Sequence, residues 1–283
     1  MEFNDKLDNL KSIISEYRQS ISSSTETETA ASSIAAAPPP LPSSSSTTTA
    51  PSSSSSSTSS STPSSSSSTT TTTSSSYIIT ETTYKRFLIG SKGDVDAASK
   101  KMIEYLKWRE IEKPENINSN DDGVKTEYDK GYSIIYKTDK LLRPVLYVQA
   151  NKYDKNNRIL DHVQKFVIWE MEIAVYQLAK PEDEKIVVLF DLLDFSLIKT
   201  MDYEVVKMFI NILQNNYDEI LGLGIIINSP WIFSACWKII KPWLDPTTAA
   251  KIRFMNIEEV TEVIELNNLP EFLQKQLKID AVM

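Results

Sequence analysis

The stretch NNYDEILGLGIIINSPWIFSACWKIIKPWLDPTTAAKI, residues 215–252, concentrates the signals that decide the fold. Its run GLGIIIN (222–228) is almost wholly apolar and rich in β-branched residues, which is typical of a strand covered on both faces. The Asn-Ser-Pro sequence at 228–230 interrupts that run and predicts a hinge. A second apolar segment ends at Pro242, because proline cannot continue a helix. We therefore expect a buried strand, a hinge and a helix of residues 231–241 in succession.

The helix expected at residues 231–241 carries an unusual concentration of apolar surface. Three of the five tryptophans of the chain lie between Trp231 and Trp243. At about 100° per residue, an apolar arc of roughly 160° is formed by Ile232, Phe233, Cys236, Trp237, Ile239 and Ile240. The opposite side holds Ser234, Lys238 and Lys241. Both a core helix and a helix that moves against lipid need such a face, and on residues alone an apolar face is more often core.

Charge and cysteine content narrow the class of protein. The formal net charge is −8 and the pI about 4.9, which argues against a general nucleic-acid binder. The single cysteine, Cys236, allows no intramolecular disulfide, so we expect a reducing, cytoplasmic environment. Residues 1–19 are charged throughout and do not resemble a signal peptide. No run of about 18 apolar residues occurs, so contact with a membrane is expected to be transient and peripheral.

Composition divides the chain into four expected regions. Residues 1–21 predict a short amphipathic helix, which either docks on its own domain or contacts a membrane or partner. Residues 22–76 predict a disordered linker, because Ser43 to Ser76 is almost entirely Ser and Thr and offers nothing to bury. The spacer could also carry phosphates. Residues 77–116 predict a helical region, and residues 117–283 a larger domain with a sizeable core.

The larger domain alternates α and β patterns. A helix capped by Asp94 is expected to end at Pro114. Strands are expected at 132–136, 144–150, 185–192, 222–228 and 251–257. Helices are expected at 159–179, 202–217 and 231–241. This alternation predicts a mostly parallel five-stranded sheet flanked by helices.

These segments resemble the CRAL-TRIO lipid-binding family over Tyr84 to Phe272. The resemblance is carried by RFLIGSKGDVDAASKKMIEYLKWR (86–109), YKTDKLLRPVLYV (136–148), VVLFDLLDFSL (187–197), the stretch 215–252 and NNLPEFL (267–273). It implies an α/β fold in which a small helical region precedes a sheet that encloses a hydrophobic lipid pocket. The chain departs from the family pattern at Leu142, where Gly is usual, at Asp218, where Pro is usual, and at Leu273 and Gln274, where two glycines are usual.

The resemblance also implies which residues contact a lipid. Residues 231–241 match the gate helix that closes over the pocket and opens at a membrane. The walls and gate of the pocket are expected from Val188, Phe190, Phe209, Leu213, Ile225, Ile227, Trp231, Phe233, Trp237 and Ile240. Lys92, Glu219 and Lys251 match residues that bind a phosphatidylinositol head group, and Ser196 matches a hydroxyl that holds phosphatidylcholine. Ser91 and Ile220 stand where two arginines are usual. The residues alone allow plainer roles, as core side chains, surface ion pairs and a turn hydroxyl.

The expected function is therefore that of a monomeric carrier that binds one phospholipid or similar hydrophobic molecule and carries or presents it between membranes. A lipid sensor or protein-interaction scaffold of the same fold is the alternative. A hydrolase is not expected, because His162 is the only imidazole and no G-x-S-x-G nucleophile motif occurs. No close-spaced set of metal ligands occurs either, so no metal or cofactor is expected.

Overall fold

The computed structural model describes residues 2–34 and 79–280. The chain divides into two compact units, one formed by Met1–Tyr17 with Thr80–Met283 and the other by Arg18–Ile79. The first unit is built from α-helices α1 (Phe3–Ile34, of which residues 3–17 belong here), α2 (Glu81–Gly90), α3 (Val95–Glu112), α4 (Asp122–Lys130), α5 (Leu160–Ile173), α6 (Tyr203–Asn216), α7 (Phe233–Ile240), α8 (Pro246–Ala250), α9 (Ile257–Val263) and α10 (Glu271–Asp280). Its strands are β1 (Ser133–Thr138), β2 (Pro144–Gln149), β3 (Ile186–Asp191), β4 (Leu221–Ile227) and β5 (Ile252–Phe254).

The amino-terminal helix α1 docks on its own unit through its first turns. Leu10 and Ile14 are fully buried, and the Lys11 ammonium lies 3.5 Å from the carboxylate of Glu81 in α2. These contacts favour the docking interpretation of this helix over a free membrane helix. The helix does not end at residue 21 as predicted but continues to Ile34, since the sequence up to that point contains neither proline nor glycine. The rest of the predicted linker, residues 35–76, lies outside the described residues.

The five strands form one sheet in the order β1-β2-β3-β4-β5. β1 pairs antiparallel with β2, and every other neighbouring pair is parallel, so the predicted mostly parallel sheet is confirmed. The last strand is shorter than predicted, because Asn256 begins α9. The Asn256 side chain accepts a hydrogen bond from the Glu259 amide, and the Glu259 carboxylate accepts one from the Asn256 amide, both at 2.8 Å.

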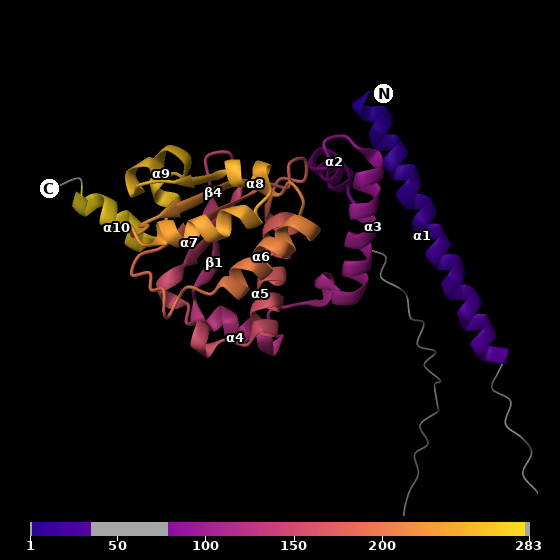
Figure 1. The fold of residues 1–283 in the computed structure, drawn as a ribbon, viewed down its shortest axis with the longest axis horizontal. Coiled ribbons are helices and arrows are strands. Elements are labelled where there is room, and N and C mark those ends of the chain that lie inside the picture. The colour runs from indigo at the N-terminus through magenta and orange to yellow at the C-terminus, as the bar shows by residue number, and fades with distance from the viewer. Residues whose placement is uncertain (1, 35–78, 281–283) are drawn as a thin grey trace, which may run out of the picture. The chain divides into compact units, whose positions relative to one another are not determined.

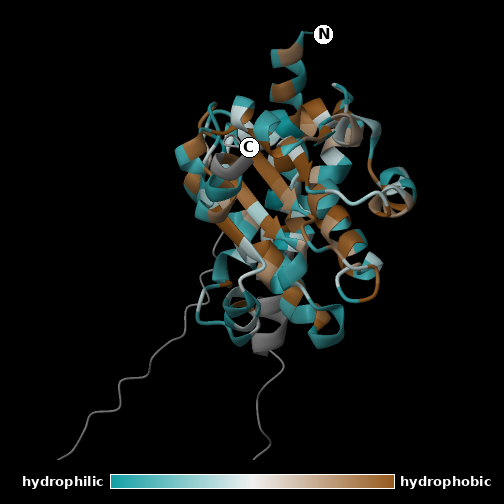
Figure 2. Cartoon of the chain, turned by 90° about the vertical axis from the view of Figure 1, so that its left-hand side faces the viewer, coloured by the Kyte–Doolittle hydropathy of each residue, from teal (hydrophilic) through white to brown (hydrophobic). Residues whose placement is uncertain are grey.

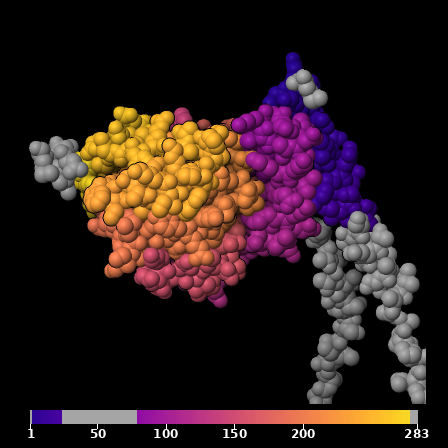
Figure 3. All heavy atoms as spheres, in the orientation of Figure 1, coloured from indigo at the N-terminus to yellow at the C-terminus, as the bar shows by residue number. Residues whose placement is uncertain are grey.

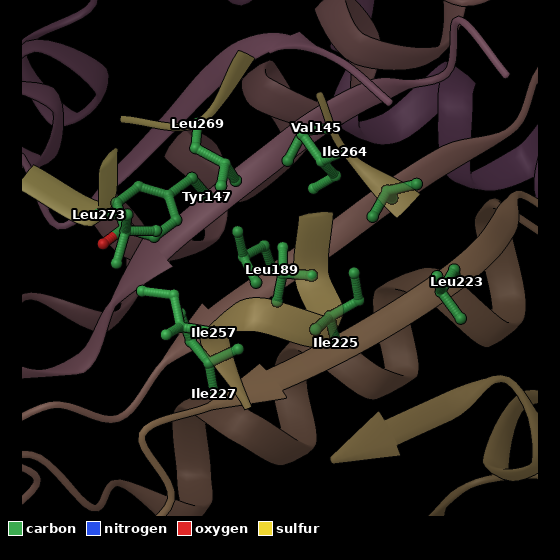
Figure 4. Close-up of a cluster of buried hydrophobic side chains, with 12 residues drawn as sticks. Val145, Tyr147, Leu189, Leu223, Ile225, Ile227, Ile257, Ile264, Leu269 and Leu273 are labelled. Atoms are coloured by element: carbon green, nitrogen blue, oxygen red, sulfur yellow. The ribbon is translucent and has the colours of Figure 1, made fainter. Parts of the chain in front are cut away.

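One face of the sheet is sealed by the carboxyl-terminal helices. Alternate strand residues such as Tyr147, Leu189 and Ile225 pack there against Val260 of α9 and Leu273 of α10. Figure 4 labels these strand residues and Leu273 in this cluster. These side chains are at most 1% exposed, so this face is a closed hydrophobic core. Figure 2 shows the hydrophobic strands running through the middle of the unit, with hydrophilic residues gathered on the surrounding helices and loops.

The other face of the sheet is covered by α5, α6 and α7, which lie together across the strands (Figure 1). Ile168 and Met171 of α5 and Ile212 of α6 pack against Leu146 and Val188 of the sheet. α7 begins at Phe233 rather than at residue 231 and gives way to a short 3-10 turn at Lys241–Trp243, as Pro242 requires.

The helices α2 and α3 are joined by buried ion pairs to α5 and to the loop before β3. Figure 3 shows these two helices in magenta, beside the orange and yellow surface of the later elements. The Arg86 guanidinium donates to Glu184 at 2.7 Å, and the Arg109 guanidinium donates to Glu172 at 2.9 and 3.0 Å. Both arginine side chains are 3% exposed. A π-helical turn that follows α5 places the Tyr176 hydroxyl 3.3 Å from the Arg86 guanidinium, which closes the network. Buried charges of this kind require their partners, so the predicted helical region and sheet domain fold as one body.

Candidate functional site

A cavity of about 240 Å³ lies between the sheet and the helices α5, α6 and α7. Its walls are apolar almost throughout. Of the residues expected in a pocket, those that line this cavity are Val188, Phe190, Phe209, Leu213, Phe233, Trp237 and Ile240. Cavities large enough for water are uncommon in close-packed protein interiors, so this one is a candidate ligand site.

The alternation of side chains along β4 decides which residues reach the cavity. Gly224 and Ile226 line it, whereas Ile225 and Ile227 point to the opposite face and pack in the closed core with α9. The expectation that Ile225 and Ile227 belong to the pocket wall is therefore corrected. Successive residues of a strand face opposite sides of the sheet, and a continuously apolar run does not reveal which set faces which side.

The helix α7 forms one wall of the cavity and has an exposed outer surface. Phe233 is buried and packs edge-on against Phe195 with ring centroids 5.3 Å apart. Trp237 packs edge-on against Phe254 at 5.4 Å. Trp231 does not line the cavity; its side chain precedes α7, is 86% exposed and borders a separate surface hollow. This position suits contact with another surface rather than with a ligand inside.

The connection from β4 to α7 is held by one buried carboxylate. Asn228 adopts a left-handed conformation with φ 51°, which asparagine tolerates better than most residues. Its side-chain amide donates to Asp191 at 2.8 Å, and the Tyr147 hydroxyl donates to the other oxygen of Asp191 at 2.8 Å. Asp191 is 2% exposed. The hinge predicted at 228–230 thus begins at a residue tied firmly to the sheet.

A carboxyl group also faces the cavity. Glu170 of α5 is 3% exposed and lines the cavity together with Ser133 of β1, whose hydroxyl donates to Glu170 at 2.8 Å. Burial raises the pKa of Glu170 to about 8, although the bond from Ser133 opposes the shift. The carboxyl group is therefore mostly neutral at pH 7 and can donate a hydrogen bond.

The expected head-group residues fall in three different environments. Glu219 and Lys251 meet, with the Lys251 ammonium 2.8 Å from the Glu219 carboxylate. Burial opposes ionisation of Glu219, but the hydrogen bonds and positive charges of Lys251 and Lys185 together outweigh it and lower the pKa of Glu219 below its ordinary value. Lys92 is exposed in the turn after α2, where its φ is 55°. Ser196 does not line the cavity. Its hydroxyl accepts a hydrogen bond from the Lys199 amide, which fits the alternative role of a turn hydroxyl.

A family model described as the CRAL/TRIO domain matches residues 128–274, which is more than half of the chain. The chain belongs to the CRAL/TRIO family. The resemblance and the fold class expected from the sequence are therefore confirmed, and this CRAL/TRIO protein has the five-stranded sheet and flanking helices described above.

Similarity to curated proteins covers the same region. The chain is 33% identical over 193 residues to the CRAL-TRIO domain-containing protein C3H8.02 of Schizosaccharomyces pombe, and 32% identical over 196 residues to the phosphatidylinositol transfer protein CSR1 of Eremothecium gossypii. Each alignment covers 65% of this chain, but only 43% and 44% of the relatives, so the chain matches less than half of their length. The crystal structure of Sfh5 has the same fold, with 18% identity and a TM-score of 0.50 over 62% of this chain and 63% of that one.

Two side chains at the site of this CRAL/TRIO protein, those of Lys185 and Glu170, were not predicted from the sequence. Lys185 lies 3.6 Å from the Glu219 carboxylate, yet in the sequence it ends the polar run EDEK. Glu170 shares a helix face with Val163 and Val167, which both line the cavity. The spacing of four and three residues between them was a signal that could have identified Glu170 as an inward-facing acid.

The described part of the chain lacks two features of other protein classes, a metal-ligand cluster and a membrane-spanning helix. Residues 2–34 and 79–280 hold no cluster of three or more histidine, cysteine or acidic side chains suited to a metal ion. Within the same ranges, none of the helices combines the length and apolar composition that a membrane-spanning segment needs. His162 stands beside Gly123 at the start of α5, and its Nδ1 is buried without a hydrogen-bond partner among these residues.

Proposed function

We propose that this CRAL/TRIO protein binds one phospholipid molecule with its acyl chains in the cavity and carries it between membranes. The observation that carries the proposal is the apolar cavity between the sheet and α5, α6 and α7. Apolar surface without a packing partner is unfavourable in water, and an acyl chain would supply the missing contacts. Membership of the CRAL/TRIO family, and similarity to a protein named for phosphatidylinositol transfer, support a phospholipid as the ligand.

The size of the cavity bears on how a lipid enters. A volume of about 240 Å³ is smaller than the roughly 300–1,000 Å³ of typical pockets for drug-sized ligands, so a wall must move to admit a phospholipid. We assign this movement to α7, the gate helix expected at 231–241. It has eight residues, its outer side chains Ser234, Lys238 and Ile239 are exposed, and a left-handed residue precedes it.

The position of the lipid head group follows from charge. Burial of a phosphate requires cationic or hydrogen-bonding partners. Leu221 lines the cavity and stands two residues after Glu219, and Ile252 lines it and directly follows Lys251. The Glu219–Lys251 ion pair is therefore close in sequence to two residues of the cavity wall. We therefore place the head group at Glu219 and Lys251. Lys92 would complete the site only if the turn after α2 moved toward it, and Ser196 is assigned to an alternative head-group position.

The experiment combines detection of the ligand with a blocked cavity. Native mass spectrometry of the purified chain is expected to show one bound phospholipid. In the variant Val206→Trp, an indole enters the cavity from α6, and uptake of fluorescent phospholipid by delipidated protein is expected to fall at least ten-fold. Lys207→Trp, on the exposed side of the same helix, is the control and should bind as the wild type does.

Transfer is then measured between donor and acceptor liposomes. A carrier is expected to move lipid faster than the spontaneous rate, and Val206→Trp to abolish the gain. Lipid uptake without transfer would support a sensor that only holds its ligand. Failure of the delipidated wild type to take up any phospholipid would refute the proposal.

A further inference from the structure

Three charged side chains meet at the edge of the sheet where β3, β4 and β5 begin. Lys185 directly precedes β3, Lys251 directly precedes β5, and Glu219 stands two residues before β4. The Glu219 carboxylate lies 2.8 Å from the ammonium of Lys251 and 3.6 Å from that of Lys185. The Lys185 ammonium also donates to the main-chain carbonyl of Glu219. This Lys185–Glu219–Lys251 cluster is half-buried, with side chains 23%, 15% and 23% exposed.

The cluster places two ammonium groups on one carboxylate. Burial, and after it the proximity of Lys251, lower the pKa of Lys185, so the two cations are held together at a cost. The other charged groups near Lys185 do not neutralise the excess positive charge of the two ammonium groups. Arg86 is already paired with Glu184, and the Asp183 side chain is exposed to solvent, where its attraction is screened. An anion placed between the two ammonium groups would relieve the repulsion.

The apolar cavity reaches the same edge of the sheet. Leu221, the first residue of β4, and Ile252, the first of β5, both line it. Lys251 precedes Ile252 directly, and Ile186, which follows Lys185, is paired with Leu221. A cavity for hydrocarbon thus ends beside two cations, and this arrangement complements an amphiphile with an apolar tail and an anionic head.

The backbone at Glu219 supports a functional origin for the cluster. Glu219 adopts φ 58°, a left-handed conformation that is energetically unfavourable for most residues other than glycine. Strained residues of this kind persist where the surrounding structure holds them, and they gather at ligand sites. The strain and the paired lysines are separate observations at the same position.

We propose that Lys185 is a second head-group cation, which with Lys251 binds the phosphate of an anionic phospholipid and makes the protein prefer anionic over zwitterionic lipids. The inference rests on the proposed function and names the class of lipid and the residue that selects it. A zwitterionic lipid such as phosphatidylcholine brings its own quaternary ammonium to the site, which adds a third cation beside Lys185 and Lys251. An anionic lipid brings none.

The test compares two lipids and two lysine variants in the full chain. Delipidated protein is titrated with vesicles that contain fluorescent phosphatidylinositol or fluorescent phosphatidylcholine, and the dissociation constants are compared. Lys185→Gln is expected to weaken phosphatidylinositol binding about ten-fold, the effect of one lost charge-assisted contact, and to change phosphatidylcholine binding by less than about two-fold. Lys180→Gln removes the same charge from an exposed position in the same connection and should change neither.

The outcomes separate this inference from the proposed function. An unchanged phosphatidylinositol affinity in Lys185→Gln, or an equal loss for both lipids, would overturn the role of Lys185 while leaving lipid binding intact. Stabilisation of the lipid-free protein by inorganic phosphate alone, seen as a raised melting temperature, would assign the cluster to a free anion instead. If the wild type bound neither lipid, the proposed function would fail, and this inference with it.

Discussion

The Glu170 carboxyl should make the stability of the lipid-free protein fall as the pH rises. Glu170 lines an apolar cavity, and Ser133 is the one residue that hydrogen-bonds to it in the described part of the chain. The hydroxyls of Tyr132 and Tyr153, two other residues of the cavity wall, donate to Glu127 and Asp202. Among the residues that line the cavity in the described part of the chain there is no lysine or arginine to compensate the ionised form, so ionisation opposes folding.

The magnitude follows from the pKa. The value is about 8 in the folded protein and 4.5 for an ordinary glutamate. At about 1.4 kcal/mol for each tenfold change in proton affinity, the difference corresponds to at most about 5 kcal/mol. Because the folded pKa is the higher one, this contribution is fully present below about pH 4.5 and is lost as the pH rises to about 8. Water entering the cavity would reduce the effect, so about 2 to 5 kcal/mol is expected.

The variant Glu170→Gln isolates this effect. A glutamine cannot ionise, and its carbonyl oxygen can still accept the hydrogen bond from Ser133. The free energy of unfolding of the delipidated wild type and variant is measured by urea denaturation from pH 5 to pH 9. The variant should gain about 2 to 4 kcal/mol relative to the wild type across this range, because about 1 kcal/mol of the effect already falls below pH 5. Glu262→Gln, an exposed substitution in α9, serves as the control and should show a constant difference.

A difference between Glu170→Gln and the wild type that did not change with pH would refute this reasoning. It would mean either that Glu170 is already ionised at pH 5 or that the cavity is hydrated enough to carry its charge. The sign is also decisive, because a variant that lost stability as the pH rose would indicate that the charged form of Glu170 has an unrecognised cationic partner.

Three further predictions concern the region of α7, the turn between β1 and β2, and the hinge before α7. Trp231→Ala should change the free energy of unfolding by less than about 0.5 kcal/mol, because the side chain is 86% exposed. Trp231→Ala and Trp237→Ala should each slow lipid transfer between liposomes several-fold, and unchanged transfer rates would count against α7 as a gate. Leu142→Gly should raise the free energy of unfolding by about 1 kcal/mol, since Leu142 has φ 64°, and urea denaturation measures it. Asn228→Gly keeps the backbone conformation but removes the hydrogen bond to Asp191. The free energy of unfolding should fall by about 1 to 3 kcal/mol, and lipid exchange should become faster. A slower exchange would contradict this role for the hinge.

The fold could be predicted because its signals are local and repeated. The apolar runs of β3 and β4, the Asp94 cap of α3 and the break at Pro242 each depend on a few neighbouring residues. The Asp94 side chain accepts the Ala97 amide at 3.0 Å, as an N-cap should. The predicted end of the first helix was wrong, since a run of Ser, Thr and Glu is compatible with both helix and linker.

The candidate site could be predicted only in part, because it depends on contacts distant in sequence. Glu219 and Lys251 were identified as head-group candidates from the family resemblance, and the structure shows that they form an ion pair. The direction of Ile225 could not be predicted, since both faces of a buried strand are apolar. Lys185 was invisible as a site residue, because only the pairing of β3 with β4 brings it to Glu219.

The ion pairs of Arg86 and Arg109 set the smallest fragment of the chain that can fold by itself. The family match begins at residue 128, after α2 and α3 have ended. A fragment cut there would retain Glu184 and Glu172 but lose both guanidinium groups, and two carboxylates would be stranded in the interior with no counter-charge. The smallest autonomous folding piece therefore starts at α2 or earlier, some fifty residues before the boundary that sequence similarity draws.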